Sequence, residues 1–112
     1  MDCIFCAIIE GKIPSKKVYE DENVFAFLDI NPQAPVHCLV VPKCHIESIN
    51  SVGDDNISAA SKVIAAIPKI AGILGLENGY RVTTNVGEDG CQSVKHLHVH
   101  ILGGKKLSDN MG

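Results

Sequence analysis

Several features are absent from the sequence, and each absence excludes a class of protein. The 112 residues carry 10 Lys+Arg against 13 Asp+Glu, a formal net charge of −3, without a dense basic block. Proteins that bind duplex DNA or a membrane surface need a basic face. The longest apolar stretch is only a few residues, too short to span a bilayer. We therefore expect neither nucleic acid nor a membrane as a partner.

A basic leader and an even set of cysteines are also missing. The chain starts Met1-Asp2-Cys3, acidic where a signal peptide is basic, so we expect a cytoplasmic protein. Five cysteines are an odd number, and without a secretory context they favour thiol or metal chemistry over a disulfide framework. The hydrophobic content of 46% is enough to fill the core of a single domain over residues 1–112.

Apolar spacing predicts one short and one long helix. The short helix covers about residues 4–9, where apolar side chains share one face. In the long helix the apolar residues recur every three or four positions, and they are Ile57, Ala60, Ile64, Ile67, Ala71 and Leu74. Asp54 and Asp55 are the expected N-terminal caps, and Gly75 ends the helix. Pro68 lacks a backbone donor and predicts a kink or break near residues 64–67.

Strand signals lie between and after these helices. Residues 17–20 and 24–28 flank a turn-forming segment and predict a hairpin. Further strands are expected at residues 36–41, 80–85 and 94–102. A short and a long helix on an antiparallel five-stranded sheet make an α+β fold.

The most informative segment is the alternating run His96-Leu97-His98-Val99-His100-Ile101-Leu102. In a strand, this alternation places the imidazoles on one face and the apolar side chains on the core face. Packing alone does not explain three histidines in strict alternation. Two chemistries remain open at this point: a zinc centre that activates water, or an imidazole nucleophile assisted by its neighbours.

The loop before this run favours an anionic ligand. Its sequence is Gly87-Glu88-Asp89-Gly90-Cys91-Gln92-Ser93. Glycines let backbone N–H groups approach an anion closely, and Ser93 adds a hydroxyl. Such a loop is a weak signal alone, and its position directly before the histidines strengthens it.

With these motifs the chain resembles the histidine triad (HIT) superfamily, in the branch of nucleotide-binding proteins. The resemblance covers nearly the whole chain. Besides the histidine run, the matching residues are Ile4-Phe5, Ile13-Pro14, Tyr19-Glu20-Asp21, Ala26-Phe27-Leu28-Asp29-Ile30, Pro32-Gln33-Ala34-Pro35-Val36-His37, Pro42-Lys43, Asn85, Gly90, Gln92-Ser93 and Leu102-Gly103-Gly104.

The resemblance implies a homodimeric purine nucleoside phosphoramidase, which hydrolyses the P–N bond of an AMP-amine. His98 would attack the α-phosphorus and form a nucleotidyl-imidazole intermediate. His100 and His37 would hold phosphate oxygens. Ser93 would donate a proton to the leaving amine, and backbone N–H groups of Cys91, Gln92 and Ser93 would bind the phosphate.

The resemblance also implies a nucleoside site. Asp29 would accept the ribose hydroxyls, and Asn85 stands where the family has an active-site asparagine. The apolar slot for the base would consist of Ile4, Phe5, Ile8, Phe27, Ile30 and Leu39. On residue type alone, most of these are ordinary core residues, and Asn85 is an ordinary turn former.

A metal site is a separate expectation. Cys3-Ile4-Phe5-Cys6 has the spacing of a zinc half-site, although a single pair of cysteines with this spacing is equally a redox motif. Some members of the family complete such a site with a histidine after the third strand and with the first histidine of the triad. The resemblance therefore implies a structural zinc ion bound by Cys3, Cys6, His45 and His96.

Three features depart from the family pattern. Cys91 replaces the usual glycine of its loop, Lys95 stands where an apolar or aromatic residue is common, and the tail after Gly104 lacks tryptophan. The leaving-group preference therefore does not carry over. Three other functions remain open: a nucleotide-binding regulatory module with incidental turnover, a dinucleoside polyphosphate hydrolase, and a zinc-dependent hydrolase.

Overall fold

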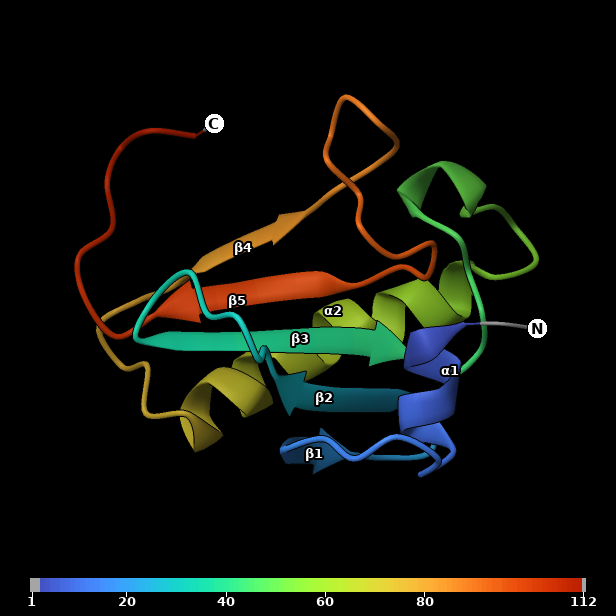
Figure 1. The fold of residues 1–112 in the computed structure, drawn as a ribbon, viewed down its shortest axis with the longest axis horizontal. Helices are drawn as coiled ribbons and strands as arrows, with labels where there is room; N and C mark the ends of the chain where they lie inside the picture. Colours follow the sequence, from blue (N-terminus) through green and yellow to red (C-terminus); the bar gives the residue numbers. More distant parts are fainter. Residues whose placement is uncertain (1–2, 112) are drawn as a thin grey trace.

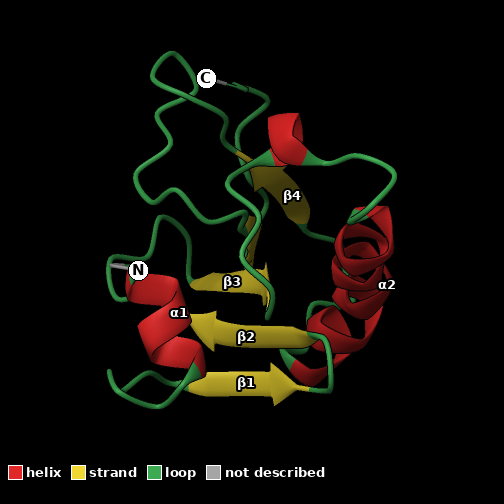
Figure 2. Cartoon of the chain, turned by 90° about the vertical axis from the view of Figure 1, so that its right-hand side faces the viewer, coloured by secondary structure: helices red, strands yellow, loops and turns green. Residues whose placement is uncertain are grey.

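The computed structural model describes residues 3–111, which form one antiparallel sheet with a helix against each face (Figures 1 and 2). The five strands lie in the order β1-β2-β3-β5-β4. The elements in chain order are α1 (Ile4–Ile9), β1 (Lys17–Glu20), β2 (Val24–Leu28), β3 (Val36–Pro42), the 3₁₀ turn η1 (Ile49–Ser51), α2 (Ile57–Ile73), β4 (Arg81–Thr84) and β5 (Val99–Gly103). This arrangement confirms the predicted α+β class.

The core lies on both faces of the central strands. On the α2 face, Val24, Ala26, Cys38, Val40, Val99 and Ile101 pack against the helix. On the α1 face, the buried cluster consists of Phe5, Ile8, Phe25, Phe27, Leu39 and Val41. Because β2 and β3 are covered on both sides, their sequences are nearly continuous apolar runs.

The pairing of β3 with β5 brings distant histidines together. Leu39 lies opposite His100, and His37 lies opposite Leu102. In an antiparallel pair this register places His37 and His100 diagonally on one face of the sheet. That face is the one that α1 covers (Figure 2).

Helix α2 differs from the prediction in its buried face and in its N-terminal cap. The residues it buries are Val63, Ala66, Ile67, Ile70 and Ala71, whereas Ile57 and Ile64 are more than half exposed. The apolar spacing fits two neighbouring faces of one helix, and packing against the sheet selects the face with small alanines. The N-cap is Asn56, not Asp54 or Asp55.

Pro68 does not break α2, which is one helix from Ile57 to Ile73. The predicted end is confirmed, because Leu74 is the C-cap and Gly75 follows at φ +73°. Among the described residues, no helix combines the length and the apolar character needed to cross a bilayer.

The last strand is shorter than predicted. β5 starts at Val99, so His96 and His98 lie before it in an irregular segment. The Leu97 N–H donates to the carbonyl of Ile46 and does not take part in a strand ladder. His96 and His98 therefore lie outside the strand ladder, although both of their rings pack against Phe5 of α1.

Candidate active site and metal centre

The histidine side chains gather beside α1 at the ends of β3 and β5. His96, His98 and His37 are at most 4% exposed, whereas His100 is only partly buried. The ring of Phe5 packs edge-on against His98 at 5.0 Å and against His96 at 6.0 Å between centroids. Phe5 of α1 therefore covers His96 and His98 and limits their contact with water.

His98 has one ring nitrogen fixed by the backbone. Its Nδ1 lies 2.7 Å from the carbonyl oxygen of His96. A carbonyl oxygen can only accept, so Nδ1 carries the proton and the neutral ring keeps a lone pair on Nε2. The Thr84 hydroxyl donates to the carbonyl of His98 at 2.7 Å and holds this backbone in place. In the neutral tautomer that this contact selects, Nε2 of His98 is the nitrogen that a nucleophile requires.

His37 and His100 form a directly bonded pair. The His37 Nε2 lies 2.8 Å from the His100 Nδ1 and 3.5 Å from Oδ2 of Asp29. Burial lowers the pKa of His37, and the nearby Asp29 carboxylate opposes this shift. Burial, with smaller effects from His98 and His37, lowers the pKa of His100 to about 4. Both rings are therefore neutral near pH 7 and disfavour the cationic form.

The loop before the histidines is held together by its own hydrogen bonds. The N–H groups of Cys91 and Gln92 donate to the carbonyls of Glu88 and Gly87. These N–H groups, which the sequence assigned to phosphate binding, therefore serve the loop itself. The N–H and exposed hydroxyl of Ser93 stay as candidate phosphate donors.

Side chains of the same loop fix its shape. Gln92 accepts from the Gly87 N–H at 3.0 Å and donates to the carbonyls of Glu47 and Val94. The Asn85 amide donates to the Gly90 carbonyl at 2.6 Å. Cys91 adopts φ +62°, a conformation that favours glycine. The hydrogen bonds assign Asn85 and Gln92 to the support of the loop.

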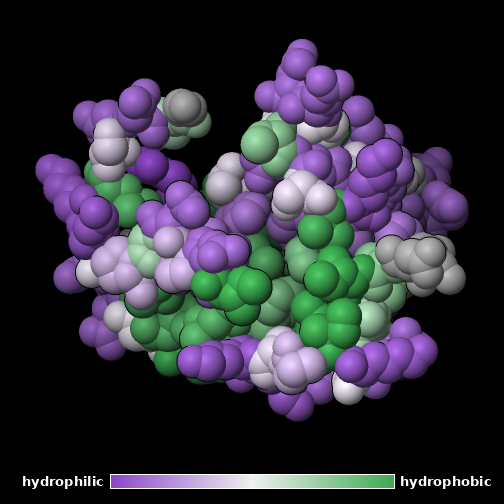
Figure 3. Space-filling model, in the orientation of Figure 1, coloured by the Kyte–Doolittle hydropathy of each residue, from purple (hydrophilic) through white to green (hydrophobic). Residues whose placement is uncertain are grey.

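The residues assigned to the base slot divide into buried and exposed members. Phe5, Ile8, Phe27 and Leu39 belong to the buried cluster beneath α1. Ile30 is 91% exposed and Ile4 is 48% exposed. Asp29 and Ile30 line a surface hollow of about 550 Å³, together with Pro14, Ser15, Lys16, Leu28 and Pro32. Figure 3 shows a hydrophobic area on the face of the molecule that Figure 1 turns toward the viewer.

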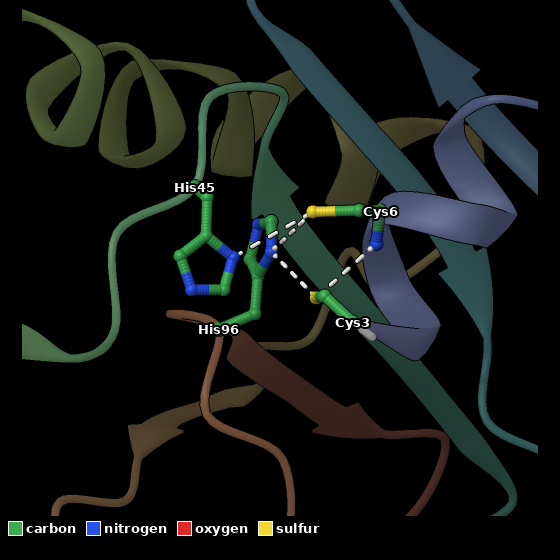
Figure 4. A group of neighbouring side chains, drawn as sticks. All are labelled: Cys3, Cys6, His45 and His96. Carbon is green, nitrogen blue, oxygen red and sulfur yellow. Dashed lines mark hydrogen bonds between the residues drawn. The ribbon is translucent and has the colours of Figure 1, made fainter. Parts of the chain in front are cut away.

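The four predicted metal ligands meet at one place (Figure 4). Cys3 is the N-cap of α1, Cys6 lies in the helix, His45 follows β3, and His96 precedes β5. Their donor atoms all lie within 4.8 Å of one another. The structure therefore brings together residues that are 90 and 93 positions apart in the chain.

The distances within this cluster suit a tetrahedral zinc ion. The His96 Nδ1 lies 3.3 Å from Cys3 Sγ and 3.5 Å from Cys6 Sγ, and the His45 Nδ1 lies 3.6 Å from Cys6 Sγ. Zinc bonds of about 2.3 Å to sulfur and about 2.0 Å to nitrogen place tetrahedral ligands about 3.5 Å apart. The residues present therefore fit the metal.

Two further contacts prepare the cluster for a metal. The His96 Nε2 donates to the carbonyl of Pro42 at 2.9 Å, which leaves the lone pair on Nδ1 facing the cysteines. Burial and the adjacent Cys3 thiol raise the pKa of Cys6 to about 11. Zinc must therefore displace a proton from this thiol when it binds. The Cys6 N–H donates to Cys3 Sγ at 3.3 Å and orients it.

The sequence did not identify several groups that position the site. These are the Thr84 hydroxyl, the Pro42 carbonyl and the backbone of Gln33, which contact His98, His96 and His37. Two of the three are backbone groups, which no sequence signal marks, and the Thr84 hydroxyl lies in a strand where threonine is an ordinary residue.

The fold and the site define a small α+β protein with clustered imidazoles beside a Cys2His2 metal centre. A family model described as HIT domain matches residues 10–107. A solved histidine triad protein from Clostridium difficile is 53% identical with a TM-score of 0.93, and the match covers 98% of this chain and 96% of that one. A solved HIT family hydrolase from Clostridium thermocellum is 43% identical with a TM-score of 0.94, over 98% and 96% of the two chains.

A relative from Zea mays, named a 14 kDa zinc-binding protein, is 46% identical over 94% of this chain and 84% of its own. The chain belongs to the HIT domain family.

Proposed function

We propose that this protein hydrolyses the P–N bond of purine nucleoside 5′-phosphoramidates, with His98 as the nucleophile. The observation that carries the proposal is the 2.7 Å contact between His98 Nδ1 and the carbonyl of His96. This contact holds the proton on Nδ1 and leaves a lone pair on Nε2 in a buried, water-poor site.

The reaction has two steps. In the first, His98 Nε2 bonds to the α-phosphorus and the P–N bond breaks, while the amine leaves with a proton that Ser93 can donate. In the second, water attacks the nucleotidyl-histidine and gives up a proton that restores Ser93, which releases the nucleoside monophosphate and regenerates the free imidazole. The neutral His100 donates a hydrogen bond to a phosphoryl oxygen and so supports the negative charge that develops there.

Nucleoside recognition takes place in the hollow beside Asp29. The Asp29 Oδ1 accepts from the Asn31 N–H at 2.8 Å, which fixes the carboxylate. The remaining acceptor capacity suits the two hydroxyls of a ribose. The exposed Ile30 and the apolar surface around it suit a purine face.

Structural zinc at Cys3, Cys6, His45 and His96 is part of the proposal. The ion would tie α1 to the segment that carries the nucleophile, and it supplies folding energy when bound. The name of the maize relative supports zinc binding.

A second copy of the chain is the proposed partner, paired along β4. This strand lies at the edge of the sheet, and Tyr80 and Val82 beside and within it are 39% and 44% exposed. An open edge with apolar side chains is a surface for strand pairing. Sedimentation should give a dimer for the wild type and a monomer for Val82→Asp; a dimer in both would place the interface elsewhere.

Turnover of an adenosine 5′-phosphoramidate with a fluorescent amine tests the function. We expect amine release by the wild type and none by His98→Ala, with AMP binding retained in calorimetry. Cys44→Ser changes an exposed thiol and is the matched control. Release by His98→Ala would refute the nucleophile. If a diadenosine polyphosphate, assayed in parallel, were cleaved faster than the phosphoramidate, a dinucleoside polyphosphate hydrolase would be favoured instead.

A further inference from the structure

The loop between β2 and β3 contacts the histidine site through one backbone group. The N–H of Gln33 donates to Nδ1 of His37 at 3.0 Å. The loop is held in shape by the Asn31 N–H bond to Asp29 and by a 3.2 Å bond from the Gln33 side chain to the Asn31 carbonyl. Pro32 and Pro35 restrict its backbone further. The N–H of Gln33 therefore has a fixed direction.

This contact determines which nitrogen of His37 carries a proton. A backbone N–H can only donate, so Nδ1 of His37 must keep its lone pair. The ring is 4% exposed, and burial lowers its pKa, which makes the neutral form the stable one. A neutral ring with a lone pair on Nδ1 has its proton on Nε2.

The proton on His37 Nε2 in turn determines the state of His100. His37 Nε2 lies 2.8 Å from Nδ1 of His100, so the His100 nitrogen is the acceptor. The Asp29 Oδ2, at 3.5 Å, is a second and weaker acceptor for the same proton. Neutral His100 then carries its own proton on Nε2, the nitrogen that His37 does not use.

We propose that the backbone N–H of Gln33 is a positioning group for His100 and acts through His37. The hydrogen-bonded chain from Gln33 through His37 to His100 keeps a proton on His100 Nε2, where it can be donated to a phosphoryl oxygen. His37 is then a positioning residue, because both of its nitrogens are used inside the protein. This inference rests on the proposed function for its catalytic meaning, although its structural content stands alone.

A metal site is the competing reading of the same residues. Asp29, His37 and His100 each offer a ligand atom within 4.8 Å of the others. A metal on His37 Nε2 needs the lone pair there and the proton on Nδ1. That proton would point at the Gln33 N–H, so two donors would face each other. The observed contact therefore favours a hydrogen-bonded series over a metal ion.

Two-bond ¹H–¹⁵N spectra of the zinc-loaded protein test the inference without any substrate. We expect both His37 and His100 to be neutral and protonated on Nε2, with unprotonated Nδ1. His98 provides an internal contrast, because its proton belongs on Nδ1. A proton on Nδ1 of His37, or a second bound zinc that Asp29→Asn abolishes, would overturn the proposal.

Variants of His37 test its consequence for catalysis. Glutamine can donate from a position near Nε2, whereas leucine cannot donate. We expect His37→Leu to lower kcat by about tenfold, the scale of one lost hydrogen bond, and His37→Gln to restore most of it. The Kd for AMP should change by less than about threefold in both. A large loss of AMP affinity without a change in kcat would show that His37 contacts the phosphate directly.

An amide-to-ester substitution at Gln33 removes the N–H and keeps the side chain. We expect His37 to lose its single tautomer in the ¹⁵N spectrum, and an unchanged spectrum would refute the role of Gln33. If the wild type shows the expected tautomers but no turnover, the proposed function is wrong, while the hydrogen-bonded chain from Gln33 to His100 is confirmed.

Discussion

At the scale of single residues, one type of side chain has different roles because the backbone engages different ring nitrogens. The Pro42 carbonyl holds a proton on Nε2 of His96 and frees Nδ1 for a metal. The His96 carbonyl holds a proton on Nδ1 of His98 and frees Nε2 for attack. Adjacent histidines of the same triad are thus prepared for the two proposed roles, a metal ligand and a nucleophile.

The lowered pKa of His100 predicts a pH dependence of stability. Its folded value is about 4, against 6.5 for an unperturbed ring, chiefly because of burial. The unfolded chain therefore binds this proton first as the pH falls, so stability decreases between about pH 6.5 and about pH 4. Thermal unfolding in this window should show a shallower decrease for His100→Gln than for the wild type, at equal zinc loading. Parallel curves would contradict the assignment.

The sequence predicts which residues form the site, but not which backbone atoms select the tautomers of its histidines. Spacing and resemblance together selected Cys3, Cys6, His45 and His96, which the fold brings together. The tautomers depend on backbone groups of Gln33, Pro42 and His96, whose chemistry every residue shares. Only the folded path of the chain determines which of these groups meets which ring.

At the scale of elements, the sequence predicted the types and the order of the helices and strands correctly. It did not predict which face of α2 packs against the sheet. The short helix and the first three strands lie within one residue of their expected bounds. Ile57 and Ile64 continue the apolar spacing of α2 but are exposed, because the helix rests on the face with Val63, Ala66 and Ile70. Spacing alone does not indicate which of two adjacent apolar faces meets the sheet.

The loop before the triad gives a prediction at this scale. A Cβ on Gly90 would clash with the carbonyl oxygen of Val86 and lie 2.8 Å from its nitrogen, and both are rigid backbone atoms. We expect Gly90→Ala to destabilise the fold by about 1–3 kcal/mol and to lower turnover by displacing the loop. Urea unfolding measures the change.

Gly72 is the matched control, because a Cβ there meets no atom within 4 Å and the residue lies within α2. Alanine is the better helix former, so Gly72→Ala should stabilise by roughly 0.5–1 kcal/mol. If Gly90→Ala were as stable as Gly72→Ala, the tight approach of Gly90 to Val86 would be disproved.

At the scale of the whole molecule, the metal cluster and the histidine site share one structural support. The cluster joins α1, the segment after β3 and the segment before β5. Phe5 of α1 packs on His98, and His96 connects the two sites through its ring and its carbonyl. We therefore expect the order of the proposed active site to depend on the metal cluster.

Removal of zinc should lower stability more than it changes the chemical step. Zinc at about 1,000 times its Kd stabilises by about 4 kcal/mol, and about 1 kcal/mol moves Tm by roughly 4 °C in a chain of this size. We therefore expect chelation, or Cys6→Ser, to lower Tm by more than about 10 °C. Residual folded protein should still form the nucleotidyl adduct.

Cys44→Ser, which changes an exposed thiol outside the cluster, should leave both Tm and zinc content unchanged. Folded, zinc-free protein that has lost all activity would instead indicate a zinc-dependent hydrolase.

In the proposed reaction, His98 forms a covalent bond to the nucleotide. The most direct measurement is mass spectrometry of the intact and digested protein, quenched at short times after mixing with an adenosine 5′-phosphoramidate. We expect an adenylyl adduct on His98 in the wild type and none in His98→Ala. Turnover that proceeds with no adduct at any quench time, or an adduct on another residue, would contradict the role of His98 as the nucleophile.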